Sequence, residues 1–146
     1  MLRHAKRATT ARTKGTTPAR LRAAKHAAAA SLRIRLRVYV GEEIAIGPGK
    51  AQLLEQIART GSILGAARSL EMSYMRAWTL VRTMNHCFEK PLVRTARGGS
   101  QGGRAVLTSH GKEILALYVD MTEKSHRAAT PSWRKLRAKL ASSRYT

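Results

Sequence analysis

The chain has 146 residues, of which 28 are Lys or Arg and only 8 are Asp or Glu, so its formal net charge is +20. Such a charge attracts polyanions, above all nucleic acid, with an anionic membrane surface as the rival partner. A membrane-spanning role is excluded because no apolar run approaches the ~20 residues that a bilayer requires. The single cysteine excludes an intramolecular disulfide and a cysteine-based zinc site, and it fits a reducing, cytoplasmic location.

The charge is unevenly distributed and indicates the domain boundaries. Residues 1–31 carry eight Lys or Arg and no acid, and residues 131–146, which Pro131 opens, carry five and no acid. We therefore expect a basic disordered arm over 1–31, a folded domain over 32–126 and a basic tail over 127–146. Acid-free, Arg-rich N-termini are also typical of organelle transit peptides, and the sequence leaves that interpretation of the arm open.

The folded domain is expected to begin with a strand over residues 32–38, where apolar and basic residues alternate with the period of a half-buried strand. Ile44 and Ile46 indicate a short second strand. Pro48 then suits the first turn of a helix that ends near Gly61. The outward-facing residues of the first strand would be Arg33, Arg35 and Arg37.

Two helices separated by a very short turn follow. Ser62 opens the first, which ends at Leu70. After a turn over Glu71 and Met72, Ser73 caps the second. Two helices joined by so short a turn make a helix-turn-helix, whose second helix can enter the major groove of DNA.

Behind these helices the sequence predicts a β-hairpin, which in this context is called a wing. Its strands are Leu92–Thr95 and Ala105–Leu107, and its Gly-rich loop is Arg97–Arg104. Thr108 caps a last helix that is expected to run to about Lys124. The fold class is therefore mainly α with a small β component, namely a winged helix-turn-helix with a long C-terminal dimerisation helix.

The second helix of the pair carries the residues expected of a recognition helix. Its apolar face, from Ala77 to Phe88, has the 3.6-residue period and faces the core. On the opposite face, Arg76 and Arg82 are suited to bind guanine edges or phosphates. The alternative is that these arginines only form a solvated face of the helix. We expect Trp78 to pack against the first strand or helix rather than on bases. The residues expected to contact DNA are Ser62, Ser73, Tyr74, Met75, Arg76, Thr79, Arg82, Thr83, Arg97 and Arg104.

The wing has two interpretations that the sequence leaves equal. Its glycines let the backbone approach a duplex closely, and Arg97 and Arg104 at the base of the loop could reach the minor groove or flanking phosphates. The alternative is a flexible hairpin tip without DNA contact.

The last helix indicates an oligomer. Its apolar residues wrap too much of its surface for one buried stripe, so one face would cover the core and the other would pair with a second copy. A symmetric dimer reading two half-sites follows. The alternative is that the N-terminal strand covers the second face within one monomer. The residues expected to dimerise are Ile114, Leu117, Tyr118 and Met121.

No catalytic, cofactor or metal site is expected. His86 and Cys87 are adjacent on a helix and cannot face one site, and no histidine pairs with a carboxylate at a useful spacing. We therefore expect a non-enzyme that binds double-stranded DNA as a sequence-specific transcription regulator. The alternative is a nonspecific nucleoid-associated or RNA-binding protein driven by its basic tails.

Several short motifs occur together between Gly47 and Leu117. They are GPG at Gly47–Gly49, TGS at Thr60–Ser62, AAR at Ala66–Arg68, MSYMRAW at Met72–Trp78, PLV at Pro91–Val93 and LTSHGKEILALY at Leu107–Tyr118. In this order they resemble the N-terminal DNA-binding domain of the ModE-type molybdate-responsive transcription regulators. The segment is also similar to the winged helix of LysR-type regulators.

The resemblance implies a regulator linked to molybdenum metabolism, with two departures. Met75, Thr79 and Arg82 stand where the ModE pattern is expected to have lysine and acids, which implies a different operator. In that family a C-terminal module senses molybdate. We expect the chain, which stops at Thr146, to lack that module and not to bind molybdate directly.

Overall fold

The computed structural model describes residues 30–98 and 103–140. The basic arm expected over residues 1–31 therefore lies outside the described residues except for its last two. The tip of the wing loop (99–102) and the end of the basic tail (141–146) also lie outside them.

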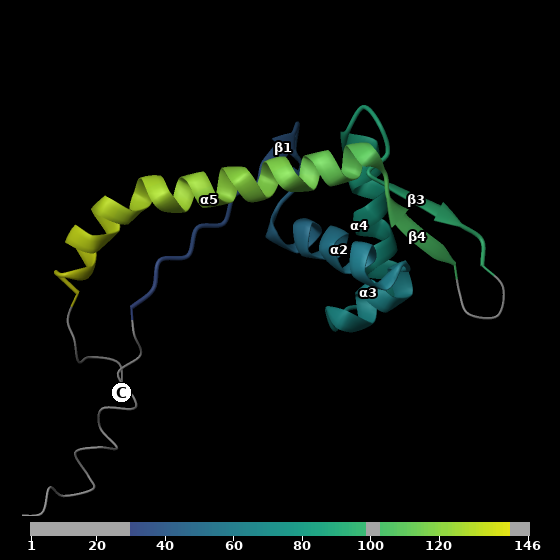
Figure 1. The fold of residues 1–146 in the computed structure, drawn as a ribbon, viewed down its shortest axis with the longest axis horizontal. Coiled ribbons are helices and arrows are strands. Elements are labelled where there is room, and N and C mark those ends of the chain that lie inside the picture. Colours follow the sequence, from purple (N-terminus) through teal and green to yellow (C-terminus); the bar gives the residue numbers. More distant parts are fainter. Residues whose placement is uncertain (1–29, 99–102, 141–146) are drawn as a thin grey trace, which may run out of the picture.

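The described residues form a mainly α-helical domain with two small β-hairpins, as the sequence predicts, and the arrangement is that of a winged helix. In Figure 1 the three shorter helices lie beneath one half of the long C-terminal helix, and one hairpin extends beyond them on one side. The elements are β1 (Val38–Val40), β2 (Glu43–Ile46), α2 (Pro48–Thr60), α3 (Ile63–Ser69), α4 (Tyr74–Cys87), β3 (Val93–Ala96), β4 (Arg104–Leu107) and α5 (Ser109–Arg137).

The predicted helix starts are confirmed, and so is the predicted end of α2. The side chains of Ser62, Ser73 and Thr108 cap α3, α4 and α5, each accepting a hydrogen bond from the backbone N–H three residues on, at 2.9, 3.1 and 2.9 Å. Pro48 occupies the first turn of α2. That helix ends at Gly61, whose φ of 71° lies in the left-handed region that glycine adopts without a steric penalty.

The core lies between α2, α4 and the start of β3. Its largest fully buried side chains are Leu53, Leu54, Ile57, Met84 and Leu92. The apolar face predicted for α4 is confirmed, since Ala77, Val81 and Met84 are buried and Phe88 packs against the cluster. The opposite face of α4 is therefore left to solvent or to a partner.

The strand expected over residues 32–38 is wrong in extent, because only Val38–Val40 pairs, with β2. The alternation itself is confirmed: Leu32, Ile34, Leu36 and Val38 are half-buried, and the arginines between them are exposed. Residues 30–37 run along α5 in Figure 1, and the Tyr118 hydroxyl donates to the Leu36 carbonyl at 3.0 Å. A helix has no free mid-chain backbone groups to pair with a strand, so the segment is extended without becoming part of a sheet.

The last helix is also longer than expected. It continues past Lys124 to Arg137 and contains Pro131, which we expected to open the basic tail. Residues 127–137 are thus helical. Proline removes one N–H and leaves the carbonyl of Arg127 without its helical partner. Because Arg127 is exposed, that carbonyl can bond to water and the helix tolerates the loss.

The side-chain amide of Asn85 and a backbone hydrogen bond hold the wing hairpin against the helices. The Asn85 Oδ1 of α4 accepts from the Leu92 and Val93 N–H groups at 2.8 and 3.1 Å, and its Nδ2 donates to the Val93 carbonyl at 2.9 Å. The Ala105 N–H donates to the carbonyl of Gly61 at 2.8 Å. The wing is therefore fixed beside α4 from two directions.

The first turn of α5 approaches the wing too closely for a side chain. A Cβ at Gly111 would overlap the Leu92 carbonyl oxygen and lie only 2.9 Å from the Leu92 carbonyl carbon. The Thr108 N–H donates to that same oxygen at 2.9 Å. Glycine at this position lets the helix and the start of β3 touch through their backbones.

Candidate nucleic-acid interface

The turn between α3 and α4 sets the angle of the helix-turn-helix. The Met72 N–H donates to the carbonyl of Ala67 at 3.0 Å, and Leu70 caps the first helix. Glu71 has a φ of 52°, the left-handed conformation that glycine adopts most readily. Buried Ala66 and Ala67 let the two helices approach closely.

The outer face of α4 is exposed, as its sequence predicts. Tyr74 is 47% exposed and Met75 65%, while Arg76, Thr79 and Arg82 are also exposed. Thr83 is half-buried. These six residues, Tyr74 to Thr83, therefore lie on a surface that a partner can reach.

The hydroxyl protons of the two threonines on that face are already used in hydrogen bonds to the backbone of α4. The Thr79 hydroxyl donates to the Met75 carbonyl at 2.8 Å, and the Thr83 hydroxyl donates to the Thr79 carbonyl at 3.0 Å. A hydroxyl that donates once keeps lone pairs free to accept. Thr79 and Thr83 thus present acceptors, which match amino groups of bases rather than carbonyls.

A groove separates the N-terminal half of α4 from the wing, and we call it the helix–wing groove. Its volume is about 740 Å³. The floor includes Leu64 of α3 and the aromatic pair Tyr74 and Trp78, which are one helical turn apart. The remaining lining residues are Ile63, Thr95, Ala96, Arg97, Gly98, Gly103, Arg104 and Ala105.

Trp78, which the sequence predicts to pack against the first strand or helix, is 38% exposed and borders the helix–wing groove together with Leu64 of α3. The Arg82 guanidinium lies over its ring, 5.6 Å from the centroid, in cation–π geometry. Neither Leu64 nor Trp78 was expected in the site from the sequence. Both are apolar residues that lie outside the core-facing stripe of their helix, and this position is the sequence signal by which they could have been found.

The other side of α4 borders a second groove of about 690 Å³, lined by Glu43, Thr79, Arg82, Thr83, Asn85 and His86. Glu43 belongs to the β1–β2 hairpin and lies 3.6 Å from the Nζ of Lys50, which is itself buried and donates to the Ile44 carbonyl. His86 is exposed on the same side of α4. The outer face of α4 therefore lies between the wing and this hairpin.

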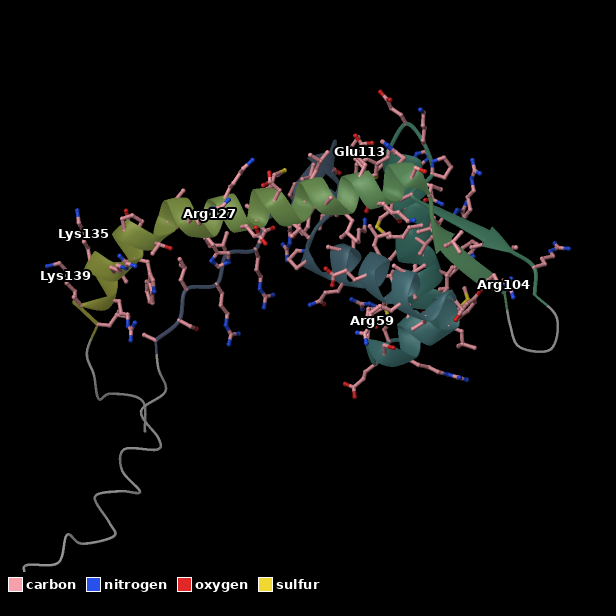
Figure 2. All side chains as sticks on the ribbon, viewed as in Figure 1. Arg59, Arg104, Glu113, Arg127, Lys135 and Lys139 are labelled. Atoms are coloured by element: carbon pink, nitrogen blue, oxygen red, sulfur yellow. The ribbon has the colours of Figure 1, made fainter. Side chains whose placement is uncertain are left out.

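The remaining candidate contacts lie on the wing and at the starts of α3 and α4. Arg97 and Arg104 are exposed where the wing strands meet the loop, and Figure 2 labels Arg104 on the hairpin. Ser73 and Ser62 both use their hydroxyl oxygens as helix caps. Ser62 is half-buried, so of the two only Ser73 is fully open to a partner.

The four residues expected to dimerise differ in their exposure. Leu117 and Met121 are 53% and 44% exposed, but Ile114 packs partly against the core. Tyr118 is buried in the core, which corrects its assignment to a partner-facing surface. Burial raises the pKa of the Tyr118 hydroxyl, and a hydrogen bond with Thr122 lowers it by less. The N-terminal segment thus covers part of the second face within one monomer, as the alternative interpretation predicts.

Within residues 30–98 and 103–140, no group of three or more His, Cys, Asp or Glu is placed to hold a metal ion. In the same part of the chain, no helix is both long and apolar enough to cross a membrane.

Similarity to known proteins covers one segment of about half to two thirds of the chain. The chain is 48% identical over 71 residues to the molybdenum-pterin-binding protein MopA of Rhodobacter capsulatus, covering 49% of this chain and 27% of that protein. It is 38% identical over 85 residues to the DNA-binding transcriptional dual regulator ModE of Escherichia coli K12, covering 58% and 32%. With the transcriptional regulator ModE of Haemophilus influenzae it shares 33% identity over 96 residues, covering 66% and 37%.

Over this segment the chain is ModE-like. The match spans only about a quarter to a third of the length of those relatives. No family model matches the chain.

Proposed function

We propose that this protein is a sequence-specific DNA-binding transcription regulator and not an enzyme. The observation that carries the proposal is the exposed outer face of α4, held beside a fixed wing by Asn85 and bearing Arg76 and Arg82. A second helix of this kind is the element that enters the major groove. The relative in Escherichia coli is a DNA-binding transcriptional dual regulator, which supports the same function.

The proposed DNA contacts fall into two groups, those made to bases and those made to phosphates. Arg76 and Arg82 suit bidentate bonds to guanine, and Thr79 and Thr83 suit amino groups because their protons are already used. Tyr74 and Met75 are exposed beside them and suit apolar contact with thymine methyl groups. The residues proposed to bind phosphates and so position the helix are Ser62, Ser73, Arg97 and Arg104.

We further propose that the regulator acts as a homodimer on two half-sites. The exposed Leu117 and Met121 of α5 carry this part of the proposal, with Ile114 at the edge of the contact. Helix pairing along α5 would relate two copies of α4 by a two-fold axis, as the reading of two symmetric half-sites requires. Tyr118 is left out because it is buried in its own monomer.

The link to molybdenum rests on the names of the relatives alone. We propose that the regulator serves molybdenum metabolism in the cytoplasm without binding molybdate itself. A strongly cationic surface attracts any dianion by screened Coulomb forces, so molybdate and sulfate should give equally weak, salt-sensitive heats in calorimetry. Saturable binding that selects molybdate over sulfate would contradict this.

The charge of +20 favours a second candidate, a nonspecific nucleoid-associated or RNA-binding protein. The proposed arm 1–31 and the basic end of the chain would then do most of the binding. A regulator should prefer its operator over scrambled duplex by ~10³-fold or more at physiological salt, whereas a nonspecific binder should not. Binding of both duplexes at two salt concentrations separates the candidates.

The test of the recognition helix compares two arginines. Arg76→Ala should weaken cognate binding by ~1–3 kcal/mol and relax the preference at one base pair. Arg35→Ala, on the outward face of the segment along α5, should have a smaller effect that is equal for all sequences. A panel of single-base operator variants gives the answer. If Arg76→Ala shifts every duplex equally, Arg76 binds phosphate, and if neither variant matters, α4 is not in the groove.

A further inference from the structure

The helix–wing groove presents apolar side chains to solvent beside a face proposed to bind a highly charged polymer. Leu64, Tyr74 and Trp78 are 36%, 47% and 38% exposed, and they come together from α3 and α4. Arg97 and Arg104 stand on the wing side of the same groove. The groove thus combines an apolar floor with two cations on one wall.

The pairing of β3 with β4 decides which wing residues face the groove. Thr95 and Ala105 are register partners and both line it. Their neighbours Arg94 and Val106, the next pair along the ladder, line a different pocket instead. The pair Ala96 and Arg104, which is nearest the loop, also borders the groove, so the groove follows the loop end of the wing, and Arg94 and Val106 are not part of its lining.

The shape of duplex DNA determines what lies between a helix and a wing. The major groove is about 12 Å wide and admits a helix, while the minor groove is about 6 Å wide. Between them runs the sugar–phosphate backbone of one strand. A protein with α4 in the major groove and the wing at the adjacent minor groove must therefore enclose that backbone between the two elements.

We propose that the helix–wing groove holds this sugar–phosphate backbone. The carbon-rich edges of consecutive deoxyriboses would lie on Leu64 and Trp78, and their phosphates would meet Arg97 and Arg104. The inference rests on the proposed function and adds to it a contact that reads no base. It also explains why apolar side chains are exposed here, since they gain burial only against the uncharged part of the backbone.

The two walls of the groove predict different salt responses. Removing an arginine that binds a phosphate should make the slope of log K against log salt less steep by about 0.9. Removing an apolar side chain displaces no counterions and should leave that slope unchanged. The two kinds of contact can therefore be told apart in the same binding experiment.

The experiment uses the full chain with cognate and scrambled duplexes. Trp78→Ala should weaken binding to both by about tenfold, and Leu64→Ala by several-fold, without changing the salt slope. Arg97→Ala should weaken both duplexes and flatten the slope. Leu64→Ala is needed because Trp78→Ala also releases the stacked Arg82. Val106→Ala is the matched control, an apolar residue 56% exposed on the other face of the same hairpin, and should bind as the wild type.

Hydroxyl-radical cleavage measures the same contact from the DNA side, since the radical attacks deoxyribose carbons. The wild type should protect a short run of sugars on one strand beside the major-groove contacts. Leu64→Ala and Trp78→Ala should restore cleavage at those sugars, while Val106→Ala should leave the protection intact. Circular dichroism confirms that each variant is folded.

Three results would overturn the inference. The first is wild-type affinity of both Leu64→Ala and Trp78→Ala, and the second is a loss confined to one base pair, which would make the groove a base reader. The third is a change in the oligomeric state of Leu64→Ala or Trp78→Ala relative to the wild type. That result would make a second copy of the chain the occupant of the groove. Failure of the proposed function looks different: the wild type would then show no operator preference, and the groove could still be tested on scrambled duplex.

Discussion

Replacing Gly111 by Ala tests the backbone contact that joins α5 to the wing. The new Cβ would overlap the Leu92 carbonyl oxygen and lie 2.9 Å from the carbonyl carbon and 3.1 Å from the Cα. All three are backbone atoms, so no flexible side chain can move aside. Either the first turn of α5 or the start of β3 must shift.

The expected cost follows from three contributions. Forcing extra atoms into a well-packed contact costs typically 1–3 kcal/mol and sometimes more, and backbone overlap belongs at the upper end of that range. A shift of Leu92 also weakens the 2.9 Å hydrogen bond from the Thr108 N–H, which contributes about 1 kcal/mol. Alanine recovers about 1 kcal/mol through its better helix propensity. Gly111→Ala should therefore lower the free energy of unfolding by about 3 kcal/mol.

Thermal unfolding followed by circular dichroism measures the loss. For a domain of this size about 3 kcal/mol corresponds to a fall in Tm of roughly 12–25 °C. Gly49→Ala is the matched control, because Gly49 lies in the first turn of α2 and a Cβ there meets nothing within 4 Å. It should raise the stability by up to about 1 kcal/mol.

The comparison has a clear refuting result. If Gly111→Ala melts within a few degrees of the wild type, the backbone of α5 does not press on Leu92 and the placement of the wing is wrong. If both alanines stabilise equally, helix propensity alone decides the effect at these positions. A destabilised but folded Gly111→Ala should also bind DNA less well, because the displaced hairpin carries one wall of the helix–wing groove.

Three further predictions concern single contacts and the basic arm. Glu71→Gly should raise stability by about 0.5–1 kcal/mol in urea titrations, because a left-handed non-glycine residue costs about 1 kcal/mol, and Glu71→Ala should not. Tyr118→Phe should cost about 1 kcal/mol by losing the bond to the Leu36 carbonyl. Burial raises the pKa of Tyr118, so the stability that its hydroxyl contributes is present below pH ~10 and is lost as the pH rises above that value. The difference in unfolding free energy between the wild type and Tyr118→Phe should therefore narrow in urea titrations at alkaline pH. Deleting residues 1–31 should weaken binding to all duplexes and flatten the salt dependence, by about 0.9 for each phosphate that the arm binds in the wild type; a changed operator preference would make the arm a groove reader.

Local patterns predicted much of the fold because their causes are local. Ser62, Ser73 and Thr108 were recognisable as caps, since a short hydroxyl side chain before an apolar period satisfies the first free N–H groups of a helix. The buried and exposed faces of α4 followed from its 3.6-residue period. Alternation predicted which residues of the segment before β1 are half-buried.

The pairing of the segment before β1 and the length of α5 were harder to predict from the sequence, because both depend on the tertiary surroundings of those elements. The alternation at residues 32–38 resembles a strand, but a strand also needs a neighbour with free backbone groups, and α5 has none. Pro131 is a helix breaker by type. It is tolerated here because the carbonyl that it leaves unpaired, at Arg127, lies on an exposed residue.

For the candidate interface too, some features were predictable from the local sequence and others depended on the tertiary structure. By itself the sequence determined the charge, the caps, the helix-turn-helix and which residues of α4 face outward, because each depends on residues within a few positions of one another. Only the tertiary structure decided that Leu64 and Trp78 meet the wing in one groove and that Tyr118 belongs to its own core. Those contacts join residues far apart in the chain, and their geometry is set by Asn85, Gly111 and the packing of whole elements, which no periodicity contains.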